Sequence, residues 1–246
     1  MTNYLTNTFP IINIYKKASL NSEIITQMIY GDSFSISKKN KKWLRITVKE
    51  DNYKGFVQNK NFSFFLKPTN KINILKAEIY KFPKKQKKTF ELSFGSKIKV
   101  TDRKSKFLKF SKGWIHREAV KPISFKEKNT FKRINIFKNI KYKWGGKTFK
   151  GIDCSALVQI FINFNNKYCP RDTKDQVKYF KKNVKLKNIK KNDIIFWRGH
   201  VAVALSNKKL IHAYGPMKKT VIMEIDQTIK RIKKTANLNV IGIKRP

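Results

Sequence analysis

The chain has 246 residues, of which 40% are hydrophobic and 13% aromatic, and this content excludes a wholly disordered protein. Its 57 Lys and Arg residues against 15 Asp and Glu give a formal net charge of +42, which excludes an acidic, solvating chain. The length indicates one to three domains of modest size.

The excess positive charge has two interpretations. It could mark a polyanion partner, such as nucleic acid or a cell-wall polymer, or it could be a solvated lysine-rich surface that reflects a compositional bias. The lysines are spread along the whole chain in short clusters, such as residues 38–42 and 84–88. No motif that reads nucleic-acid bases accompanies them. We therefore favour the solvated surface and expect no specific nucleic-acid partner.

The cysteines and the N-terminal stretch indicate the compartment. Two cysteines, Cys154 and Cys169, do not make a disulfide scaffold. Residues 1–20 lack the charged start, apolar centre and cleavage site of a signal peptide. No apolar stretch reaches the length of a transmembrane helix. We expect a cytoplasmic protein without a transmembrane segment, and the sequence predicts no oligomeric state.

The first half of the chain contains a faint internal repeat. Residues 30–46 align with residues 94–110, because each runs from an aromatic residue and a glycine through two alternating stretches joined by a basic turn. A Gly-aromatic-aliphatic step follows each copy, at 55–57 and 113–115. Such patterns predict short antiparallel strands. They resemble bacterial SH3-like domains and predict two small SH3-like β-barrels, over residues 1–66 and 67–123.

The pattern changes near residue 125, and residues 124–246 are predicted to form an α+β domain. Helices are predicted at 128–142, 154–168, 173–180 and 227–236. The helix that contains Cys154 is apolar nearly all round, so we expect it to be buried. Strands are predicted at 192–199, 200–207, 209–215 and 239–245. Helices followed by a run of strands are typical of the α+β class.

Cys154 lies where a helix is predicted to begin. The unpaired N–H groups and the dipole of a helix N-terminus lower the pKa of a nearby thiol, which favours a nucleophile. Asp153 is suited to cap this helix, and Gly145, Gly146 and Gly151 permit a close approach of the backbone to a ligand.

A nucleophilic thiol also needs a base, usually His, oriented by a third polar group. His200 begins one predicted strand and His212 lies in the next. Neighbouring strands packed on the helix would bring both rings close to Cys154. Taken singly, each residue has a structural explanation, as a buried free Cys or a core His. Taken together, they indicate a catalytic set.

Four motifs resemble those of the NlpC-type cysteine peptidases of bacterial cell-wall metabolism. Tyr-x-Trp-Gly-Gly (142–146) precedes Gly-x-Asp-Cys-Ser-Ala-Leu-Val-Gln (151–159), and Gly-His-Val-Ala (199–202) and Ile-His (211–212) match the family's two histidine motifs in order. The SH3-like repeat indicates the subgroup of γ-D-glutamyl-L-diamino acid endopeptidases, also called dipeptidyl-peptidase VI. The resemblance implies a papain-like α+β catalytic domain over residues 124–246.

The resemblance implies roles by position. Cys154 would be the nucleophile, His200 the base, and His212 the residue that orients the His200 ring. Tyr142 matches the family's active-site tyrosine, whose hydroxyl would contact the substrate or the developing oxyanion. The family implies no metal and no organic cofactor.

The resemblance also implies substrate contacts. Asp153 and Ser155 flank the nucleophile, where the subgroup uses both residues to contact the substrate. Residues 170–176 resemble the subgroup's Pro-Arg-Asp-Ser pattern, so Asp172 and Thr173 would line the pocket for the free amino terminus of the substrate. Here Thr replaces the more usual Ser and keeps the hydroxyl.

Several of these residues have structural alternatives. Tyr142 and Trp144 could be core aromatics, Ser155 could be only a first-turn residue, and Asp172 could simply cap a helix. A second acidic partner for the substrate amine could come from residues 49–53, which contain Glu50 and Asp51.

Two further residues have no expected catalytic role. Cys169 matches no family position and is expected to be a small buried residue. His116 lies in the predicted second barrel and is expected to be structural or exposed.

These features predict a cysteine peptidase of murein recycling. It would hydrolyse the γ-D-Glu-diamino acid bond of murein peptides that carry a free N-terminal L-Ala. Three alternatives stay open: a wall-binding protein with an inactive catalytic domain, an amidase or acyltransferase on the same fold, and a nonspecific nucleic-acid binder. The intact Cys–His–His set argues against the first, whereas an amidase or acyltransferase would have the same triad.

Overall fold

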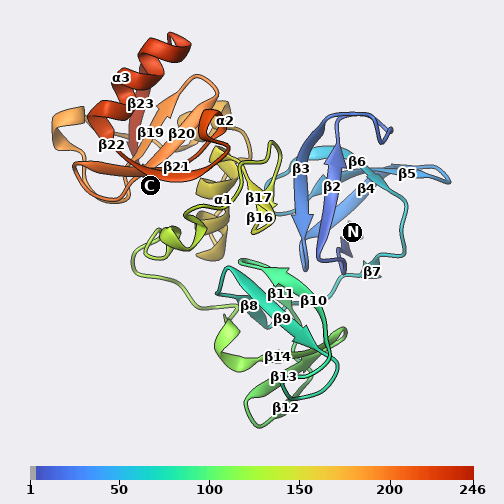
Figure 1. Cartoon of the computed structure of the whole chain (residues 1–246). Helices are drawn as coiled ribbons and strands as arrows, with labels where there is room; N and C mark the ends of the chain where they lie inside the picture. The colour runs from blue at the N-terminus through green and yellow to red at the C-terminus, as the bar shows by residue number, and fades with distance from the viewer. Residues whose placement is uncertain (1–3) are drawn as a thin grey trace. The chain divides into compact units, whose positions relative to one another are not determined.

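The computed structural model describes residues 4–246, which fall into two compact units (Figure 1). The N-terminal unit comprises the residues up to Phe125 together with Lys147–Phe149, and the C-terminal unit comprises Lys126–Gly146 and Lys150–Pro246. Residues 1–3 of the predicted first barrel lie outside the described residues. The three α-helices of the described chain are all too short or too polar to span a bilayer.

The first sheet of the N-terminal unit has seven antiparallel strands in the order β3-β2-β6-β5-β4-β1-β7. The strands are β1 (Leu5–Thr6), β2 (Ile11–Tyr15), β3 (Ile24–Ile29), β4 (Ser33–Lys39), β5 (Trp43–Val48), β6 (Lys54–Gln58) and β7 (Ser63–Phe64). Alternating apolar residues put every second side chain inside, as with Ile12 and Ile14 in β2. These side chains pack with Phe34, Leu44 and Val57 into one core.

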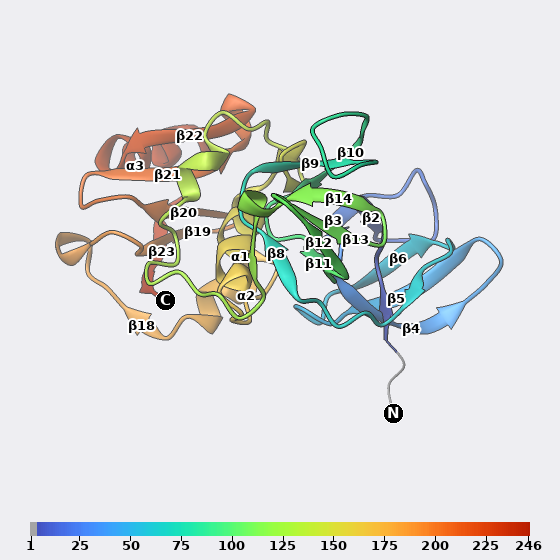
Figure 2. The same ribbon diagram turned by 90° about the horizontal axis from the view of Figure 1, so that it is seen from below.

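The second half of this unit has a core of its own. Its strands are β8 (Asn70–Ile72), β9 (Lys76–Tyr80), β10 (Lys88–Ser93), β11 (Lys97–Ile98), β12 (Asp102–Lys104), β13 (Phe107–Phe110), β14 (Gly113–His116) and β15 (Val120–Pro122). The short strand β16 (Lys147–Thr148), farther along the chain, also belongs to the N-terminal unit, where it contacts β3. A five-stranded sheet has the order β10-β9-β14-β13-β12 (Figure 2). A three-stranded sheet has the order β11-β8-β15. Ile72, Ile79, Leu92 and Ile115 are fully buried between them.

The two copies of the internal repeat differ in their pairing. In the first copy, β4 pairs directly with β5. In the second copy, the matching segment is divided into β11 and β12, which belong to different sheets. Within the described residues, the edge strands β3 and β7 of the first sheet do not pair with each other. The strand pairing therefore does not confirm two separate closed barrels.

The C-terminal unit is built on a six-stranded antiparallel sheet in the order β18-β23-β19-β20-β21-β22. Its strands are β17 (Gly151–Ile152), β18 (Lys182–Asn183), β19 (Ile194–Trp197), β20 (His200–Ala204), β21 (Lys209–Tyr214), β22 (Lys219–Glu224) and β23 (Val240–Arg245), of which β17 lies outside this sheet. The predicted strands at 192–199, 200–207, 209–215 and 239–245 are confirmed. The prediction missed β22, which lies at the edge of the sheet beside β21.

Three α-helices accompany this sheet: α1 (Cys154–Phe164), α2 (Thr173–Tyr179) and α3 (Ile225–Ala236). The helix α1 is buried along nearly its whole length, as its apolar sequence predicted, and packs against β20 and β21. In α3 only one face is apolar, and Ile225 and Ile232 on that face pack with Trp197 and Leu210 of the sheet. The position of α1 brings its N-terminus to the strands that carry the two histidines.

The helix predicted over residues 128–142 is wrong. This segment contains consecutive turns with hydrogen bonds from residue i to i−3, including the short 3₁₀ helix Ile134–Phe137, and its last residues run alongside β22. Phe131, Ile134 and Phe137 are buried, so the apolar residues recur every third position. That spacing fits the three residues per turn of a 3₁₀ helix rather than the 3.6 of an α-helix. The other 3₁₀ helices are Arg117–Ala119, Leu186–Asn188 and Gly215–Met217.

Candidate active site

Cys154 is the first residue of α1, and the preceding residue caps the helix. The Asp153 carboxylate accepts a hydrogen bond from the backbone N–H of Ala156 at 2.8 Å, so the predicted cap is confirmed. The Cys154 residue is 5% exposed. Its sulfur accepts hydrogen bonds from the backbone N–H groups of Ser155 and Val201. Because Val201 directly follows His200, this contact places the thiol beside the first residue of β20.

The expectation of a lowered pKa for the Cys154 thiol is wrong, although the Ser155 N–H at the helix N-terminus acts in the expected direction. Burial raises the pKa of the thiol to about 12, and the Asp153 carboxylate adds to the increase. The N–H groups of Val201 and Ser155 and the Arg171 guanidinium act in the opposite direction but do not outweigh burial. At neutral pH the resting group is therefore a neutral thiol, which needs a base to become a nucleophile.

The two histidines form a direct contact across neighbouring strands. The Nε2 atom of His200 lies 2.8 Å from Nδ1 of His212, within hydrogen-bonding distance. The strands β20 and β21 pair with Val203 opposite Ile211, which fixes the two rings at the same end of the sheet. The prediction that these residues lie on adjacent strands of one sheet is confirmed.

Aromatic side chains surround both imidazole rings. His212 stacks on Tyr214 with ring centroids 4.6 Å apart and planes 10° apart, and His200 lies 5.7 Å from the ring of Trp197. Burial lowers the pKa of His200 to about 4. Burial, and secondarily the neighbouring His200, lower the pKa of His212 to about 2. Both rings are therefore neutral at pH 7.

The second nitrogen of His212 determines which nitrogen carries each proton. His212 Nε2 lies 3.4 Å from the thioether sulfur of Met223, in β22. A thioether can only accept, so the proton of neutral His212 belongs on Nε2 and Nδ1 is left as an acceptor. His200 then donates from Nε2 to His212, and its lone pair lies on Nδ1. This tautomer makes His200 Nδ1 the atom available to take a proton from a thiol.

Tyr142 lies close to the thiol. It forms a parallel bridge with Ile152, and its backbone N–H donates to the Lys218 carbonyl oxygen at 2.8 Å. Burial raises the pKa of its hydroxyl, and the charge of an ionised Cys154 next to it contributes. The alternative that Trp144 is a core aromatic is wrong, because Trp144 is 60% exposed.

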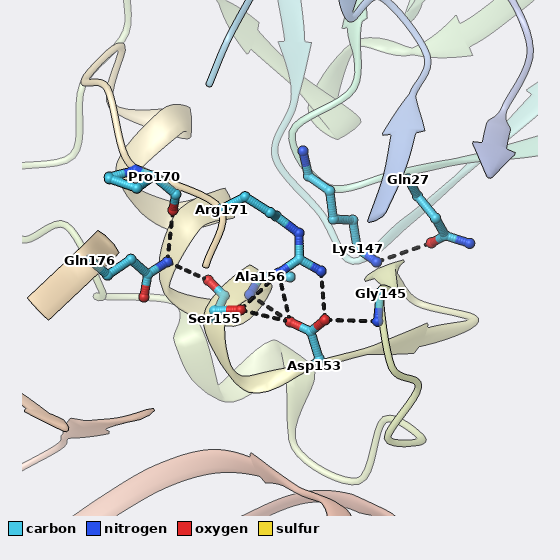
Figure 3. Close-up of polar contacts among 9 residues, drawn as sticks. All are labelled: Gln27, Gly145, Lys147, Asp153, Ser155, Ala156, Pro170, Arg171 and Gln176. Carbon is cyan, nitrogen blue, oxygen red and sulfur yellow. Dashed lines mark hydrogen bonds and ion pairs between the residues drawn. The ribbon is translucent and has the colours of Figure 1, made fainter. Parts of the chain in front are cut away.

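The side chains of Asp153 and Ser155 both form hydrogen bonds with the buried Arg171 (Figure 3). Arg171 Nη2 lies 2.5 Å from Asp153 Oδ2, and Nη1 lies 3.0 Å from Oδ1. The same Nη1 donates to the hydroxyl oxygen of Ser155 at 2.7 Å. These residues lie where the resemblance located them, beside Cys154, but their polar atoms are directed toward Arg171.

Asp172 and Thr173 lie at the start of α2. Asp172 occupies the N-cap position of α2, but its side chain makes no capping hydrogen bond, so the alternative of a simple helix cap is wrong. The backbone carbonyl of Asp172 accepts from the N–H groups of Asp175 and Gln176 instead. Thr173 is buried and Asp172 is half-buried. A role in binding a substrate amine stays a prediction for both residues.

Glu50 and Asp51, in the turn between β5 and β6, have partners inside the N-terminal unit. Glu50 lies 2.5 Å from the Lys97 ammonium and accepts from the backbone N–H of Ser33. Asp51 accepts from the backbone N–H of Tyr53 at 3.0 Å. Lys97 therefore neutralises Glu50 within its own unit, which weakens the case for Glu50 as a substrate ligand.

Cys169 and His116, which have no expected catalytic role, each contact neighbouring groups of the protein. Cys169 is fully buried, and its thiol contacts the Pro170 carbonyl oxygen at 3.6 Å. His116 packs edge-on against Phe107 and lies 3.6 Å from the Glu118 carboxylate.

Comparison with protein families identifies the domain that carries these side chains. Residues 139–236 match the model of the NlpC/P60 family. This region is an NlpC/P60 peptidase domain. Residues 14–62 match the bacterial dipeptidyl-peptidase SH3 domain, so the first sheet of the N-terminal unit is SH3-like. The NlpC/P60 match includes Cys154, His200 and His212.

Two relatives align with more than four fifths of this chain. Identity is 24% with the γ-D-glutamyl-L-lysine dipeptidyl-peptidase of Bacillus subtilis (strain 168), over 84% of this chain and 77% of the relative. It is 24% with dipeptidyl-peptidase 6 of Lysinibacillus sphaericus, over 82% of this chain and 84% of the relative. A probable endopeptidase NlpC homolog of Haemophilus influenzae is 34% identical, over 32% of this chain and 44% of its own.

Solved NlpC/P60 structures have the same fold. A family protein from Bacillus cereus ATCC 10987 superposes with a TM-score of 0.82 at 15% identity, covering 98% of this chain and 99% of that chain. An NlpC/P60 endopeptidase from Photobacterium damselae subsp. piscicida superposes with a TM-score of 0.67 at 11% identity, covering 98% of this chain and 70% of that chain.

Sequence reasoning missed three polar or sulfur-containing side chains of the NlpC/P60 site. Arg171 and Gln176 lie inside the motif at 170–176, but no role was assigned to them. A buried Asp beside the nucleophile, in a chain with few acids, was the available signal that a basic partner is needed. Met223 lies on β22, the strand that the sequence did not predict, so no signal indicated its contact with His212.

Proposed function

We propose that the protein is a cysteine peptidase that hydrolyses the γ-D-Glu-diamino acid bond of peptidoglycan peptides with a free N-terminal L-Ala. One observation carries the proposal. A buried thiol at the N-terminus of α1 accepts a hydrogen bond from the N–H of Val201, next to a His200–His212 pair whose tautomer leaves His200 Nδ1 as an acceptor. This is the arrangement that nucleophile, base and orienting residue require.

The chemistry follows from the neutral resting state. His200 Nδ1 takes the proton of the Cys154 thiol as the sulfur attacks the carbonyl carbon of the γ-D-Glu bond. The imidazolium then donates that proton to the departing amine, and a thioester with Cys154 forms. Water attacks the thioester and gives up a proton to His200, and the proton returns to the thiolate as the acid leaves. The His212 ring stabilises the charged His200 through the 2.8 Å contact.

Two groups are suited to stabilise the tetrahedral oxyanion. The backbone N–H of Cys154 is at a helix N-terminus, where the dipole favours negative charge. The Tyr142 hydroxyl lies close to the thiol and is protonated at neutral pH, because burial raises its pKa further above the ordinary tyrosine value of about 10. A protonated phenol can donate to the oxyanion.

The substrate class rests on the two long relatives and on α2. Their names describe dipeptidyl-peptidases, one of them acting at γ-D-glutamyl-L-lysine. A dipeptidyl-peptidase must recognise a free amino terminus, and a half-buried carboxylate such as Asp172 is a suitable counter-ion. We propose that Asp172 and Thr173 bind the substrate ammonium and that the enzyme works on released peptides in the cytoplasm, in wall-peptide recycling.

We further infer that residues 67–123 are a second SH3-like domain, between the first at 1–66 and the catalytic domain at 124–246. The internal repeat and the separate core around Ile79 and Ile115 support this division.

The decisive experiment is incubation with synthetic L-Ala-γ-D-Glu-diaminopimelate and L-Ala-γ-D-Glu-L-Lys, with products identified by mass spectrometry. The expected products are L-Ala-D-Glu and the free diamino acid. Cys154→Ala should abolish turnover, whereas Cys169→Ala, the matched control, should retain most of it. Release of ammonia or an acyl-transfer product would replace the proposal by an amidase or acyltransferase. Binding without turnover by the wild-type protein would indicate a wall-binding role.

A further inference from the structure

The best-buried ion pair of the C-terminal unit lies directly beside the nucleophile. The Arg171 side chain is 2% exposed and that of Asp153 is 6% exposed. The guanidinium contacts both carboxylate oxygens, at 2.5 Å and 3.0 Å, in the planar two-point geometry that arginine favours (Figure 3). A buried pair of this kind keeps its geometry because breaking it leaves an uncompensated charge.

The protein itself saturates the Asp153 carboxylate. Oδ1 accepts from Arg171 Nη1, from the Ala156 N–H and from the Ser155 hydroxyl, and Oδ2 accepts from Arg171 Nη2 and the Gly145 N–H. A carboxylate offers about four lone-pair sites. A substrate ammonium would therefore have to displace one of these buried donors in order to bind Asp153.

A second buried side chain, that of Gln176, also contacts the first turn of α1. Gln176, which is fully buried on α2, donates from Nε2 to the Ser155 carbonyl oxygen and to the Pro170 carbonyl oxygen, both at 2.9 Å. Ser155 is thus fixed at its hydroxyl by Arg171 and at its backbone by Gln176. The residues on both sides of Cys154 are tied to the segment 170–176.

We propose that Asp153 and Arg171 are positioning residues that act as one unit on Cys154, and that Asp153 is not a ligand of the substrate amine. Asp153 caps α1 and thereby fixes the direction of the thiol. Arg171 holds that cap in place and neutralises a carboxylate that would otherwise oppose the thiolate formed during catalysis. The inference rests on the proposed function and leaves the substrate amine to Asp172 and Thr173.

The charges around the thiol predict opposite effects for the two partners. Burial, the charges of Asp153 and Arg171, and the N–H groups of Val201 and Ser155 together determine the pKa of Cys154. The Tyr142 hydroxyl and the His200 ring, which are the other titratable groups near the thiol, are both neutral at pH 7. Among these, the Asp153 charge raises the pKa of Cys154 and the Arg171 charge lowers it. Removing either partner breaks the same ion pair, but the charge that remains has the opposite sign.

The test is the rate of iodoacetamide alkylation of Cys154 at fixed pH, in a Cys169→Ala background so that only one thiol reacts. Arg171→Met leaves the carboxylate unopposed and should slow alkylation on the order of tenfold, the scale of one nearby charge. Asp153→Asn keeps an oxygen for the cap and should accelerate alkylation by a similar factor. The double variant should lie close to the parent protein.

A second Asp–Arg pair in the same unit provides a matched control. Arg245 contacts Asp193 at 2.7 Å and 2.8 Å in the same two-point manner. Arg245→Met should lower the melting temperature without changing the reactivity of Cys154. Shifts of equal sign in Arg171→Met and Asp153→Asn, or no shift in either, would overturn the inference. If Arg171→Met does not fold, Asp153→Asn decides alone: faster alkylation supports the inference and an unchanged rate overturns it.

Substrate kinetics separate positioning from binding. With free and N-acetylated tripeptide, Asp153→Asn should lower kcat on both and leave their ratio of kcat/KM unchanged. If Asp153→Asn instead removed the preference for the free amine, Asp153 would be an amine ligand and the inference would be wrong. The alkylation rates need no substrate, so opposite shifts in an enzyme that fails to cleave the tripeptide would reject the proposed function and keep the positioning role.

Discussion

The Nε2 atom of His200 and the Nδ1 atom of His212 lie 2.8 Å apart, so one proton serves both rings at their point of contact. With the His212 proton on Nε2 against Met223, the shared proton belongs to His200 Nε2. The base and its orienting residue are therefore a linked pair, and Cys154 completes the unit.

Replacing His200 should be as damaging as replacing Cys154. His200→Ala is expected to lower kcat roughly a thousandfold, the scale of a lost general base, and His212→Ala roughly tenfold. Residues that act as one unit lose activity non-additively, so the double variant Cys154→Ala/His200→Ala should be little worse than either single variant. Single-turnover rates on the tripeptide measure this. Additive losses would show that the two residues do not share a step.

The thioether of Met223 should influence catalysis through the His212 tautomer. Met223→Leu preserves the size of the side chain and removes the acceptor, so kcat should fall about three- to tenfold, the range of one weak to ordinary hydrogen bond. KM and the melting temperature should change little. Met223→Gln restores an acceptor and should recover part of the rate.

Met217 supplies the control for that experiment. It is 38% exposed on the short helix after β21, and Met217→Leu should have wild-type kinetics. Equal rates for Met223→Leu and the wild type would remove the tautomer argument.

Activity should persist into mildly acidic solution. Burial lowers the pKa of His200 to about 4, so lowering the pH protonates the base only near that value. Between about pH 7 and pH 5, kcat/KM is expected to change less than twofold, whereas a His with an ordinary pKa near 6.5 would lose roughly twentyfold over that range. The substrate amine stays protonated throughout this range. A decline centred near pH 6.5 would show that His200 is solvated in the working enzyme.

Asp172 should bind the N-terminal ammonium of the substrate. Acetylating the N-terminal L-Ala removes the ammonium and should reduce kcat/KM roughly a hundredfold or more, because a half-buried carboxylate loses its partner. Asp172→Asn should weaken the free-amine substrate far more than the acetylated one. Asp175→Asn, an exposed acid in the first turn of the same helix, is the matched control and should keep the full preference. Equal wild-type rates on both substrates would eliminate the amine pocket.

Local patterns predicted the elements that carry the chemistry. Cys154 at the start of an apolar helix, and His200 and His212 on consecutive strands, could be located because each depends on neighbours in the sequence. The Asp153 cap followed from the same reasoning. The pKa of the Cys154 thiol could not be predicted in this way. The effect of the helix N-terminus alone lowers the pKa, whereas the burial of the thiol raises it.

The long-range partners could not be predicted in this way. The contact of Arg171 with Asp153 joins residues 18 positions apart, and the contact of Met223 with His212 needs an edge strand with little sequence signal. The helix predicted at 128–142 was wrong because a period of three residues was interpreted as one of 3.6. Over a segment of this length, a period of three residues can be told from one of 3.6 only when it is known which side chains are buried.

The 3₁₀-like turns before Tyr142 have a consequence for how this segment can change in length. Its buried side chains Phe131, Ile134 and Phe137 repeat every third residue. Inserting or deleting three residues would restore the same face inward and change the length of the segment by about 6 Å, whereas a single insertion would turn the following side chains by roughly a third of a turn. Length differences among relatives in this segment should therefore occur in steps of three.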